Sequence, residues 1–444
     1  TGLTNGTTYY YNISAADSAG NESDVTSDVS AVPSADDGDL DTNFGTNGIV
    51  SIDVGDRIGE HANIGLQTND TIIVAANWSF NGGYSKVYKL LNNGTVVSSF
   101  GNNNGYVQLT WGSTSSGKRS MLIQDNNKIV FANGTVHRFE LQRLHTNGDS
   151  DSFVGSTSLS EGYEDSEHAI GLNSDGKVIL ASNMYIITNE TSPAVSLTYN
   201  TDGSLDSYYI FNSSWTMKVY NMAVQPDGKF IVAGHVTDAN PSGPFLARYN
   251  ADGTFDTSFS SDGYLFGTSG YAFYDVAIQS DSKILVTAGD GGIHRYNSDG
   301  TLDLNFNNSW SSNYGEAKNV SLQSDGKIVT LGMIGYNTAI SRFNTDGTID
   351  NSFSGDGTII LSDFSNRSWG IKSLAIQSDD NVLVAGTYED PGGEGPAYKY
   401  LKVARIITDV VAADVTAPSL PTGLVATPGN GQVVLTWTAN SESD

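Results

Sequence analysis

Short apolar stretches alternate with polar turns throughout the middle of the chain. In MAVQPDGKFIVAG (222–234), an apolar stretch ends at Gln225, a P-D-G-K turn follows, and a second apolar stretch starts at Phe230. Apolar stretches of this length around a turn with Asp and Gly predict a β-hairpin. The pattern occurs at residues 64–76, 121–133, 170–182, 222–234, 276–288, 320–332 and 374–386.

A second pattern follows most of these hairpins. In LARYNADGTFDTSFSSDG (246–263), an apolar strand leads into an N-x-D-G turn and then an L-D-x-x-F-like segment, which we expect to be another strand. Other copies occur at residues 89–105, 142–153, 196–209, 293–306 and 340–357. Four antiparallel strands per unit, at a period of about 50 residues, are typical of propeller blades. The sequence therefore predicts an all-β protein with a seven-bladed β-propeller.

The two ends of the repeated region complement each other. The seventh unit has an apolar strand at 401–409 but no segment of the L-D-x-x-F type after it, whereas LDTNFGTNG (40–48) precedes the first hairpin. We predict that residues 39–44 pair with the strand around 401–408 as the fourth strand of the seventh blade. An N-terminal strand would then close the propeller and cover an exposed sheet edge.

The paired motifs L-D-x-x-F-G and A-I-Q-x-D-G-K-I-x-V-A-G resemble the delta-60 repeat family, which forms propellers of large secreted bacterial proteins. The resemblance covers residues 39–409. Two copies depart from the pattern: no apolar residue precedes Asp151, and Tyr208–Tyr209 replaces the Phe of the fourth repeat. The resemblance implies an extracellular or cell-surface module without an assigned activity.

The flanking segments have a different pattern. Residues 1–33 resemble the last two strands of a fibronectin type III domain, and 413–444 resemble the first two strands of another, with Trp437 expected in its core. We therefore divide the chain into 1–33, a propeller at 34–412, and 413–444. Because neither flank is long enough to bury a sandwich core, we expect the chain to be part of a longer multidomain protein.

Composition narrows the classes of partner. The chain has 49 acidic and 22 basic residues, a formal net charge of −27, which disfavours nucleic acid and anionic lipid as partners. It has no cysteine, which excludes disulfides and thiolate metal sites. No apolar run approaches the roughly 20 residues that span a bilayer, so we expect no membrane insertion.

Two sets of acidic residues resemble cation sites. Asn250, Asp252 and Asp256 match part of a calcium loop, but the bidentate carboxylate that completes such loops is missing. We interpret the N-x-D-G segments as tight turns. The cluster Asp36, Asp37, Asp39 and Asp41 is the better cation candidate. We predict no cofactor and no metal site, with calcium left open.

The search for catalytic residues gives one weak candidate. His61 and His168 each precede a first strand and follow Glu60 and Glu167, so an acid/His site on one face is conceivable, but we favour their interpretation as polar residues at the surface, since no partner that would orient them is evident. No nucleophile elbow, P-loop or dinucleotide motif is present. The recurring arginines are predicted to pair locally with the Asp of L-D; they are Arg248, Arg295, Arg342 and Arg405.

Aromatic residues suggest a binding surface. Trp111, Trp215, Trp310 and Trp369 lie in connections that enter a first strand, and the 388–399 loop on the same face carries Glu389, Asp390 and Glu394. Exposed rings would suit stacking on sugars or peptide side chains, but we favour burial of the tryptophans between blades, because Trp is usually mostly buried. The opposite face, made of the short hairpin turns, is expected to be nearly uniform.

The modular layout, the acidic composition and the lack of a catalytic motif in the sequence favour a non-enzymatic function. We expect an extracellular binding or spacer module of an adhesin-like surface protein, with a neutral or cationic protein or glycan ligand on the loop face. The alternative is a carbohydrate-active lyase or glycosidase that uses face carboxylates and His61 or His168. A propeller does not decide between them, because one fold hosts many functions.

Overall fold

The computed structural model describes most of the repeated region and short parts of both flanks. The described residues are 9–11, 29–31, 37–55, 61–77, 84–111, 119–135, 138–158, 168–183, 193–210, 215–237, 242–267, 272–307, 316–335, 337–361, 371–389, 399–408, 422–429 and 432–438.

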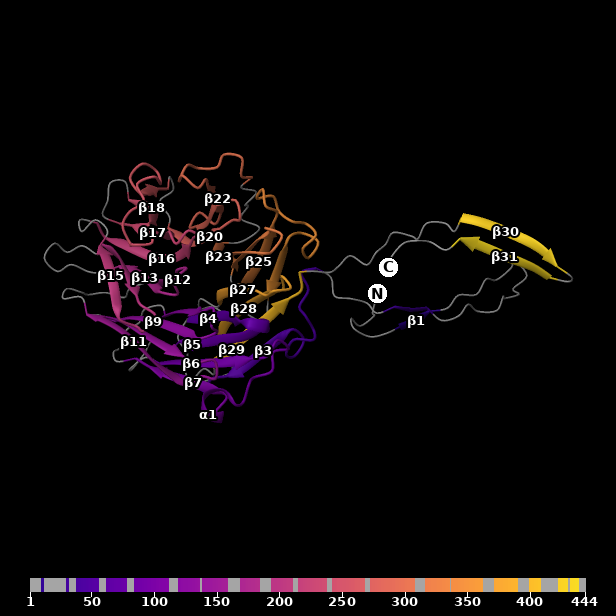
Figure 1. The fold of residues 1–444 in the computed structure, drawn as a ribbon, viewed down its shortest axis with the longest axis horizontal. Helices are drawn as coiled ribbons and strands as arrows, with labels where there is room; N and C mark the ends of the chain where they lie inside the picture. Colours follow the sequence, from indigo (N-terminus) through magenta and orange to yellow (C-terminus); the bar gives the residue numbers. More distant parts are fainter. Residues whose placement is uncertain are drawn as a thin grey trace. The chain divides into compact units, whose positions relative to one another are not determined.

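Seven antiparallel sheets, which we call blades 1 to 7 in chain order, surround a common centre (Figure 1). Within each blade the first strand is innermost, and first strands of consecutive blades contact each other, including β27 of blade 7 and β4 of blade 1. The seven-bladed propeller expected from the sequence is thus confirmed.

The strand bounds of blades 1 to 3 are as follows: blade 1 has β4 (His61–Gln67), β5 (Thr71–Asn77), β6 (Tyr84–Leu90) and β7 (Tyr106–Thr110), blade 2 has β8 (Arg119–Ile123), β9 (Ile129–Thr135), β10 (Arg138–Leu144) and β11 (Ser150–Ser158), and blade 3 has β12 (His168–Leu172), β13 (Val178–Asn183), β14 (Ala194–Tyr199) and β15 (Leu205–Ile210). Blade 1 also contains the short helices η1 (Thr68–Asp70) and α1 (Phe100–Asn103).

The bounds in the remaining blades are: blade 4, β16 (Met217–Val224), β17 (Phe230–Val236), β18 (Gly243–Tyr249) and β19 (Tyr264–Phe266); blade 5, β20 (Phe273–Ile278), β21 (Ile284–Ala288) and β22 (Ile293–Tyr296); blade 6, β23 (Glu316–Leu322), β24 (Ile328–Ile334), β25 (Asn337–Phe343) and β26 (Thr358–Leu361); blade 7, β27 (Ile371–Ile376), β28 (Val382–Glu389), β29 (Lys399–Ile406) and β3 (Ile49–Asp53).

The first hairpin of each blade turns at its Gln or Asn, as the sequence predicts. In blade 4 the N–H of Gln225 donates to the carbonyl of Lys229 at 2.7 Å, and the N–H of Gly228 donates back to Gln225 at 2.9 Å. Gly228 has φ = 85°, a conformation that glycine adopts without a steric penalty. The second strands that follow these turns are buried on both faces, because a neighbouring blade covers each of them.

The L-D-x-x-F segments do not form the fourth strands in most blades, which corrects the sequence prediction. In blade 4, Phe255 makes a single bridge to Tyr249, and the chain then turns before β19 begins at Tyr264. The turn forms because one carboxylate oxygen of Asp256 accepts the N–H of Ser258, while the Asp256 carbonyl accepts the N–H of Phe259. Blades 2 and 3 differ, since β11 and β15 run through this segment.

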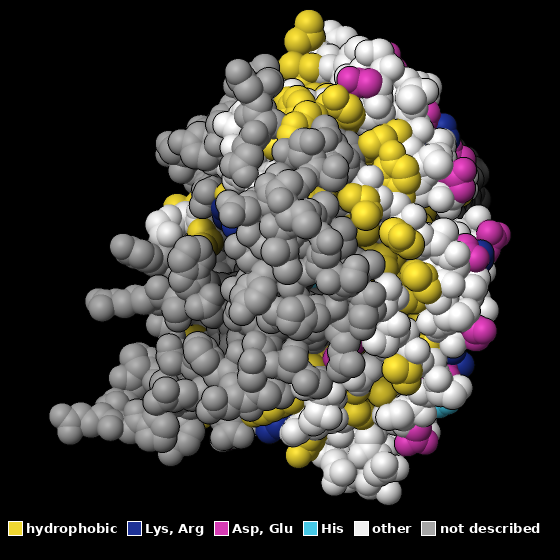
Figure 2. Space-filling view, turned by 90° about the vertical axis from the view of Figure 1, so that its left-hand side faces the viewer, with side chains coloured by type: hydrophobic (Ala, Val, Ile, Leu, Met, Phe, Trp, Pro, Cys, Tyr) yellow, Lys and Arg dark blue, Asp and Glu magenta, His cyan; other side chains and the backbone are white. Residues whose placement is uncertain are grey.

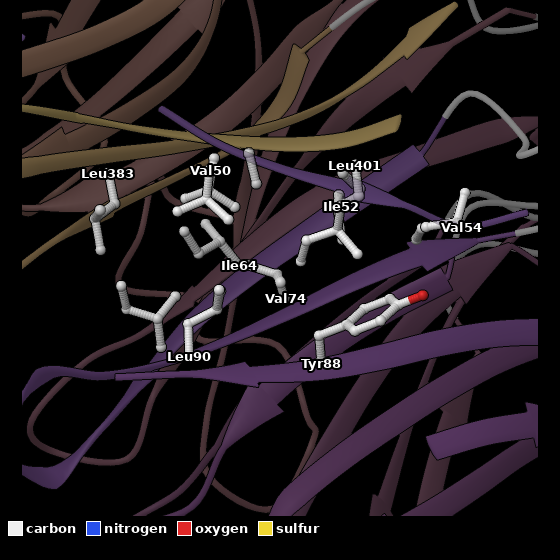
Figure 3. Close-up of a cluster of buried hydrophobic side chains, with 14 of the residues drawn as sticks. Val50, Ile52, Val54, Ile64, Val74, Tyr88, Leu90, Leu383 and Leu401 are labelled. Atoms are coloured by element: carbon white, nitrogen blue, oxygen red, sulfur yellow. The ribbon is translucent and has the colours of Figure 1, made fainter. Parts of the chain in front are cut away.

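Blade 7 takes its fourth strand from the N-terminal part of the propeller. β3 pairs with β29, with Ile52 opposite Leu401 and Val50 opposite Val403. The predicted segment 39–44 does pair with the end of β29, through the bridge from Leu40 to Ile406 and backbone hydrogen bonds of Asp39 and Asp41, but the fourth strand itself is β3. Val50 and Ile52 pack between Leu401 of blade 7 and side chains of blade 1 (Figure 3).

The flanks contain two strand pairs. β1 (Tyr9–Tyr11) pairs with β2 (Val29–Ala31), and β30 (Thr422–Gly429) pairs with β31 (Gln432–Thr438). The chain divides into two compact units, Thr1–Thr408 and Asp409–Asp444. The fibronectin type III assignment of both flanks stays a prediction. Among the described residues, no helix is long and apolar enough to cross a membrane.

Candidate functional site

The recurring arginines form a network with the L-D aspartates. In five blades the Nε of an arginine on the third strand donates to an aspartate carboxylate at 2.7–2.9 Å; the pairs are Arg143–Asp151, Arg248–Asp256, Arg295–Asp303, Arg342–Asp350 and Arg405–Asp41. In four of them a lysine from the first hairpin reaches the same carboxylate, as Lys229 does at 2.8 Å from Asp256. The predicted local pairing is confirmed.

Each of these arginines also connects its blade to the next one. The Nη1 of Arg143 donates to the carbonyl of Thr201 at 3.0 Å, and that of Arg295 donates to Thr345 at 2.6 Å. Both carbonyls belong to the N-x-D-G turn of the following blade, and a phenylalanine ring stacks on the guanidinium, for example Phe306 at 4.5 Å from Arg295. Blade 1 has Lys89 at this position, which reaches Thr146 at 3.0 Å.

The network changes the acidity of its carboxyl groups. Burial alone would raise the pKa of Asp151, but hydrogen bonds from Arg143 and Lys128 hold that pKa well below its ordinary value. Burial would also raise the pKa of Asp256, but hydrogen bonds from Lys229 and Ser258 outweigh it and lower that pKa. The hydrogen bond from Lys283 lowers the pKa of Asp303. These carboxylates are therefore ionised structural partners of cations within the protein.

The acidic cluster near residue 40 takes part in the same network. Asp41 is the partner of Arg405, and both carboxylate oxygens of Asp37 accept hydrogen bonds from Arg342. Burial raises the pKa of Asp37, although Arg342 opposes that effect. Asp36 lies outside the described residues. Asp39 is exposed, and its carbonyl accepts the N–H of Ile407 at 2.9 Å. Asp37 and Asp41 thus bind guanidinium groups, and within the described part of the chain no cluster of three or more metal-ligating side chains occurs.

The histidines do not form a shared site in the described residues. His168 is fully buried at the start of β12, where its Nε2 lies 3.0 Å from the carbonyl of Ala132 in blade 2. Because the His168 imidazole has no solvent contact and bonds to a neighbouring blade, it is a poor candidate for a general base. His61 is half-buried at the start of β4, while Glu60 and Glu167 lie outside the described residues.

The predicted binding residues lie in different environments. Trp111 is only 3% exposed and its Nε1 donates to Ser85 at 3.3 Å, so it belongs to the core, which was the alternative to an exposed ring. Trp215 is half-buried and packs edge-on against Tyr264 and Phe266, with ring centroids 5.7 and 5.4 Å away. Glu389 is the last residue of β28, where its backbone pairs with Lys399. The remaining predicted residues lie outside the described part: Trp310, Trp369, Asp390 and Glu394.

The turn face carries a cavity that the sequence did not indicate. It measures about 620 Å³ and lies between the first-hairpin turns of blades 5 and 6, next to Ser280, Gln323 and Gly326. At three other blade junctions an Asp or Asn replaces this glycine and bonds to the preceding turn, as Asp380 does to Ser324 at 2.7 Å. The cavity exists because Gly326 has no side chain to fill it, so this face is less uniform than expected.

A polar group near the centre of the ring was also missed. Asp275 on β20 is buried and accepts hydrogen bonds from Asn221 of blade 4 and Asn319 of blade 6, and from two backbone N–H groups. All three side chains occupy β-bulges of first strands. A bulge is not visible in an apolar pattern, so this contact could not be predicted from the sequence.

Comparisons with known proteins agree with the fold. The family described as "Domain of unknown function (DUF5122) beta-propeller" matches residues 225–259, 279–306 and 323–353. Each matched segment runs from the Gln turn of a blade to its L-D-x-x-F phenylalanine, in blades 4, 5 and 6. The match and the seven sheets together support a propeller built from sequence repeats. Among the curated proteins, no sequence match is found.

Several solved structures are similar to the chain at low sequence identity. Virginiamycin B lyase from Staphylococcus aureus has a TM-score of 0.49 at 9% identity, over 80% of this chain and 98% of that one. The WD40 beta propeller domain of Doa1 has a TM-score of 0.45 at 12% identity, over 77% and 93%. A protein of unknown function from Dyadobacter fermentans has a TM-score of 0.42 at 10% identity, over 81% and 99%.

Proposed function

We propose that the chain is a non-enzymatic binding module of an extracellular or cell-surface protein. In this proposal the ring is a rigid support, and the connections that enter the first strands recognise a neutral or cationic protein or glycan. Recognition residues on loops can change without disturbing the blades, which is why propellers and other scaffolds place them there.

The observation that carries the proposal is the group formed by Trp215, Tyr264 and Phe266. All three rings are half-buried, and they come from the connection before β16 and from β19 of the same blade. Partly exposed aromatic faces held by edge-on packing provide apolar area at a low cost in side-chain entropy, which suits the faces of sugars and of peptide side chains.

The charge distribution supports the same proposal. The described arginines on third strands, and the aspartates with which they pair, are engaged between blades and are thus unsuited to acid–base chemistry. On the side of the ring seen in Figure 2, hydrophobic side chains form a band over the described surface, and charged side chains lie along its right-hand edge. The net charge of −27 disfavours anionic ligands.

The test is a binding screen of the whole chain against glycan and peptide arrays. For any ligand found, we expect Trp215→Ala to weaken binding about tenfold, the effect of losing one aromatic contact of about 1.4 kcal/mol. Tyr208→Ala is the matched control, because Tyr208 is an exposed aromatic residue (57%) on the outer strand of blade 3. Equal affinities of the two variants, or no ligand on either array, would favour a spacer.

A further inference from the structure

Blade 5 differs from the other six blades at its outer edge. In each of the others a fourth strand pairs with the third, and in blade 7 that strand comes from a distant part of the chain. In blade 5, β22 is the outermost of the described strands. The fourth position of a blade therefore accepts a strand that does not directly follow the third one, and in blade 5 no described segment occupies it.

The sequence after β22 lacks a glycine that precedes the fourth strand in blades 4, 6 and 7, although not in blades 1 to 3. In blades 4, 6 and 7 a glycine stands four residues after the phenylalanine of the L-D-x-x-F segment, with φ between 85° and 96°. These glycines are Gly263, Gly357 and Gly48. The carbonyl of Gly263 accepts the N–H of Arg248 at 2.8 Å, and the other two glycines bond to Arg342 and Arg405 in the same way. Blade 5 has Trp310 at this position, and a bulky residue rarely adopts positive φ.

The edge of β22 consequently offers backbone groups for pairing. Arg295 corresponds to Arg248 in its register with the second strand, opposite Leu285 as Arg248 is opposite Ile231. Its N–H therefore points away from β21, and among the described residues no carbonyl accepts it as the glycine carbonyls do in the other three blades. Strand edges of this kind are templates for an added strand.

A cavity lies directly beside this edge. It measures about 210 Å³, and its lining includes Leu265 and Phe266 of blade 4 together with His294, Tyr296 and Leu302 of blade 5. In blade 4 the corresponding space is filled by Tyr264, which pairs with Ala247 and lies 6.2 Å from the Phe255 ring. His294 and Leu302 match Ala247 and Phe255 in the repeat, so the cavity is where an inward-facing side chain of a fourth strand would lie.

The surface around the cavity carries two exposed leucines. Leu302 is 48% exposed, and Leu304 is 86% exposed, whereas the residue at the position of Leu304 is Thr257 in blade 4 and Asn351 in blade 6. Asp290 lies beside the cavity, paired with His294 at 2.9 Å, and its side chain is one-third exposed. The edge thus combines backbone donors, an apolar cavity and a carboxylate.

We propose that β22 and this cavity bind an extended segment of another protein as the fourth strand of blade 5. The segment supplies an aromatic or leucine side chain opposite His294, as Tyr264 does opposite Ala247. Because the whole chain carries a charge of −27 and Asp290 borders the cavity, the segment is neutral or basic. Main-chain hydrogen bonds give such a complex its affinity, and the cavity gives it specificity.

The experiment uses a synthetic probe, fluorescein-labelled Gly-Tyr-Leu-Phe-Gly-Lys, which copies the strand of blade 4 and adds a basic residue. Fluorescence anisotropy should show saturable binding to the whole chain. Leu302→Asp should weaken it at least tenfold, whereas the control Ile360→Asp, at a residue of equal exposure (49%) on the fourth strand of blade 6, should leave it unchanged. Trp215→Ala removes the aromatic group of the proposed function, but Trp215 only packs on Phe266 at the border of this cavity, so the variant should change probe affinity much less than Leu302→Asp.

Three results would overturn the proposal. The first is equal affinity of the Leu302→Asp and Ile360→Asp variants for the probe, or no binding of the probe to the unchanged protein. The second is probe binding only after residues 308–315 are replaced by a Gly/Ser linker, which would assign the position to the chain's own segment. The third is a concentration-dependent dimer, measured by light scattering, that Leu302→Asp dissociates and the probe does not, which would assign the edge to a second copy.

Discussion

At the scale of single residues, the molecule is held together by buried charges that are paired between blades. Arg342 is the clearest case, since it is only 1% exposed and its guanidinium bonds to Asp350, to Asp37 and to the carbonyl of Thr408. Taking an arginine out of water costs several kcal/mol, which these partners offset. The sequence predicted the pairing with Asp350 from its spacing, but not the contact with Asp37, which is 305 residues away.

Replacing Arg342 by Met should strongly destabilise the protein. The variant leaves Asp350 and Asp37 without their main cation, so we expect the free energy of unfolding to fall by about 3–5 kcal/mol. The control is Lys177→Met, which breaks the more exposed pair with Asp206 at 2.9 Å and should cost less than about 1 kcal/mol. Urea unfolding of both variants measures the difference, and equal losses would show that the network does not depend on burial.

The link between turns of adjacent blades can be tested by a second substitution. Asp380 has φ = 63° and accepts hydrogen bonds from the N–H and hydroxyl of Ser324 in blade 6. Asp380→Gly keeps the turn conformation and removes both bonds, so we expect a loss of about 1–3 kcal/mol. Ser282→Gly, at the same turn position of blade 5 with φ = 65°, should have almost no effect. A loss of equal size in both variants would contradict the assigned role of Asp380.

At the scale of elements, the hairpins were predictable and the fourth strands were not. The Gln turns have a local signal, because Asp and Gly stand at fixed positions between two apolar stretches. The L-D-x-x-F segment has the same apolar alternation as a strand. The chain turns there, however, because the side chain of Asp256 accepts a hydrogen bond from the N–H of Ser258. The true fourth strands are short, and β3 pairs with a strand that lies about 350 residues later, which a local pattern does not reveal.

The candidate site shows the same limit. Trp111 and Trp215 occupy equivalent-looking connections in the sequence, yet one is buried and the other half-buried, because only the packing of neighbouring strands decides their exposure. The cavity next to Gly326 depends on a side chain that is absent, and the Asp275 contacts depend on bulges in three strands. None of these features has a signal within a single repeat.

The role of β3 predicts a difference between two isoleucines on fourth strands. Ile52 is 8% exposed and packs in the cluster between blades 7 and 1, whereas Ile360 on β26 is 49% exposed. Ile52→Ala should lower the free energy of unfolding by about 2–4 kcal/mol, and Ile360→Ala by less than about 1 kcal/mol. Thermal and urea unfolding provide the measurement. Equal effects would mean that β3 contributes little to the interface between these blades.

At the scale of the whole molecule, the lowered carboxyl pKa values predict loss of stability in acid. Asp151, Asp256, Asp303 and Asp350 all have a pKa below the ordinary value in the folded protein, so the unfolded chain binds more protons as the pH falls. Their stabilisation is complete above about pH 4, the unfolded pKa, and is lost below it. Asp37, with its raised pKa, acts in the opposite direction.

We therefore expect the melting temperature to be nearly constant from about pH 7 to pH 5 and to fall steeply below about pH 4. Asp256→Asn should flatten part of this decrease, because the amide does not titrate. Differential scanning calorimetry across this range measures both profiles. At about pH 2.5 the unfolded chain has protonated these aspartates while the folded protein still holds them ionised, so a wild-type melting temperature that does not change down to this pH would contradict the assigned role of the network.

Arginine, turn and strand contacts connect the blades into one ring, which should unfold cooperatively. Native-state hydrogen exchange tests this cooperativity most directly, through the amides of second strands in distant blades: Val74 of β5, Val232 of β17 and Val384 of β28, all buried. If the ring is cooperative, these amides should exchange through global unfolding, with one common free energy and one common dependence on denaturant. Distinct free energies for individual blades would show instead that the ring opens blade by blade.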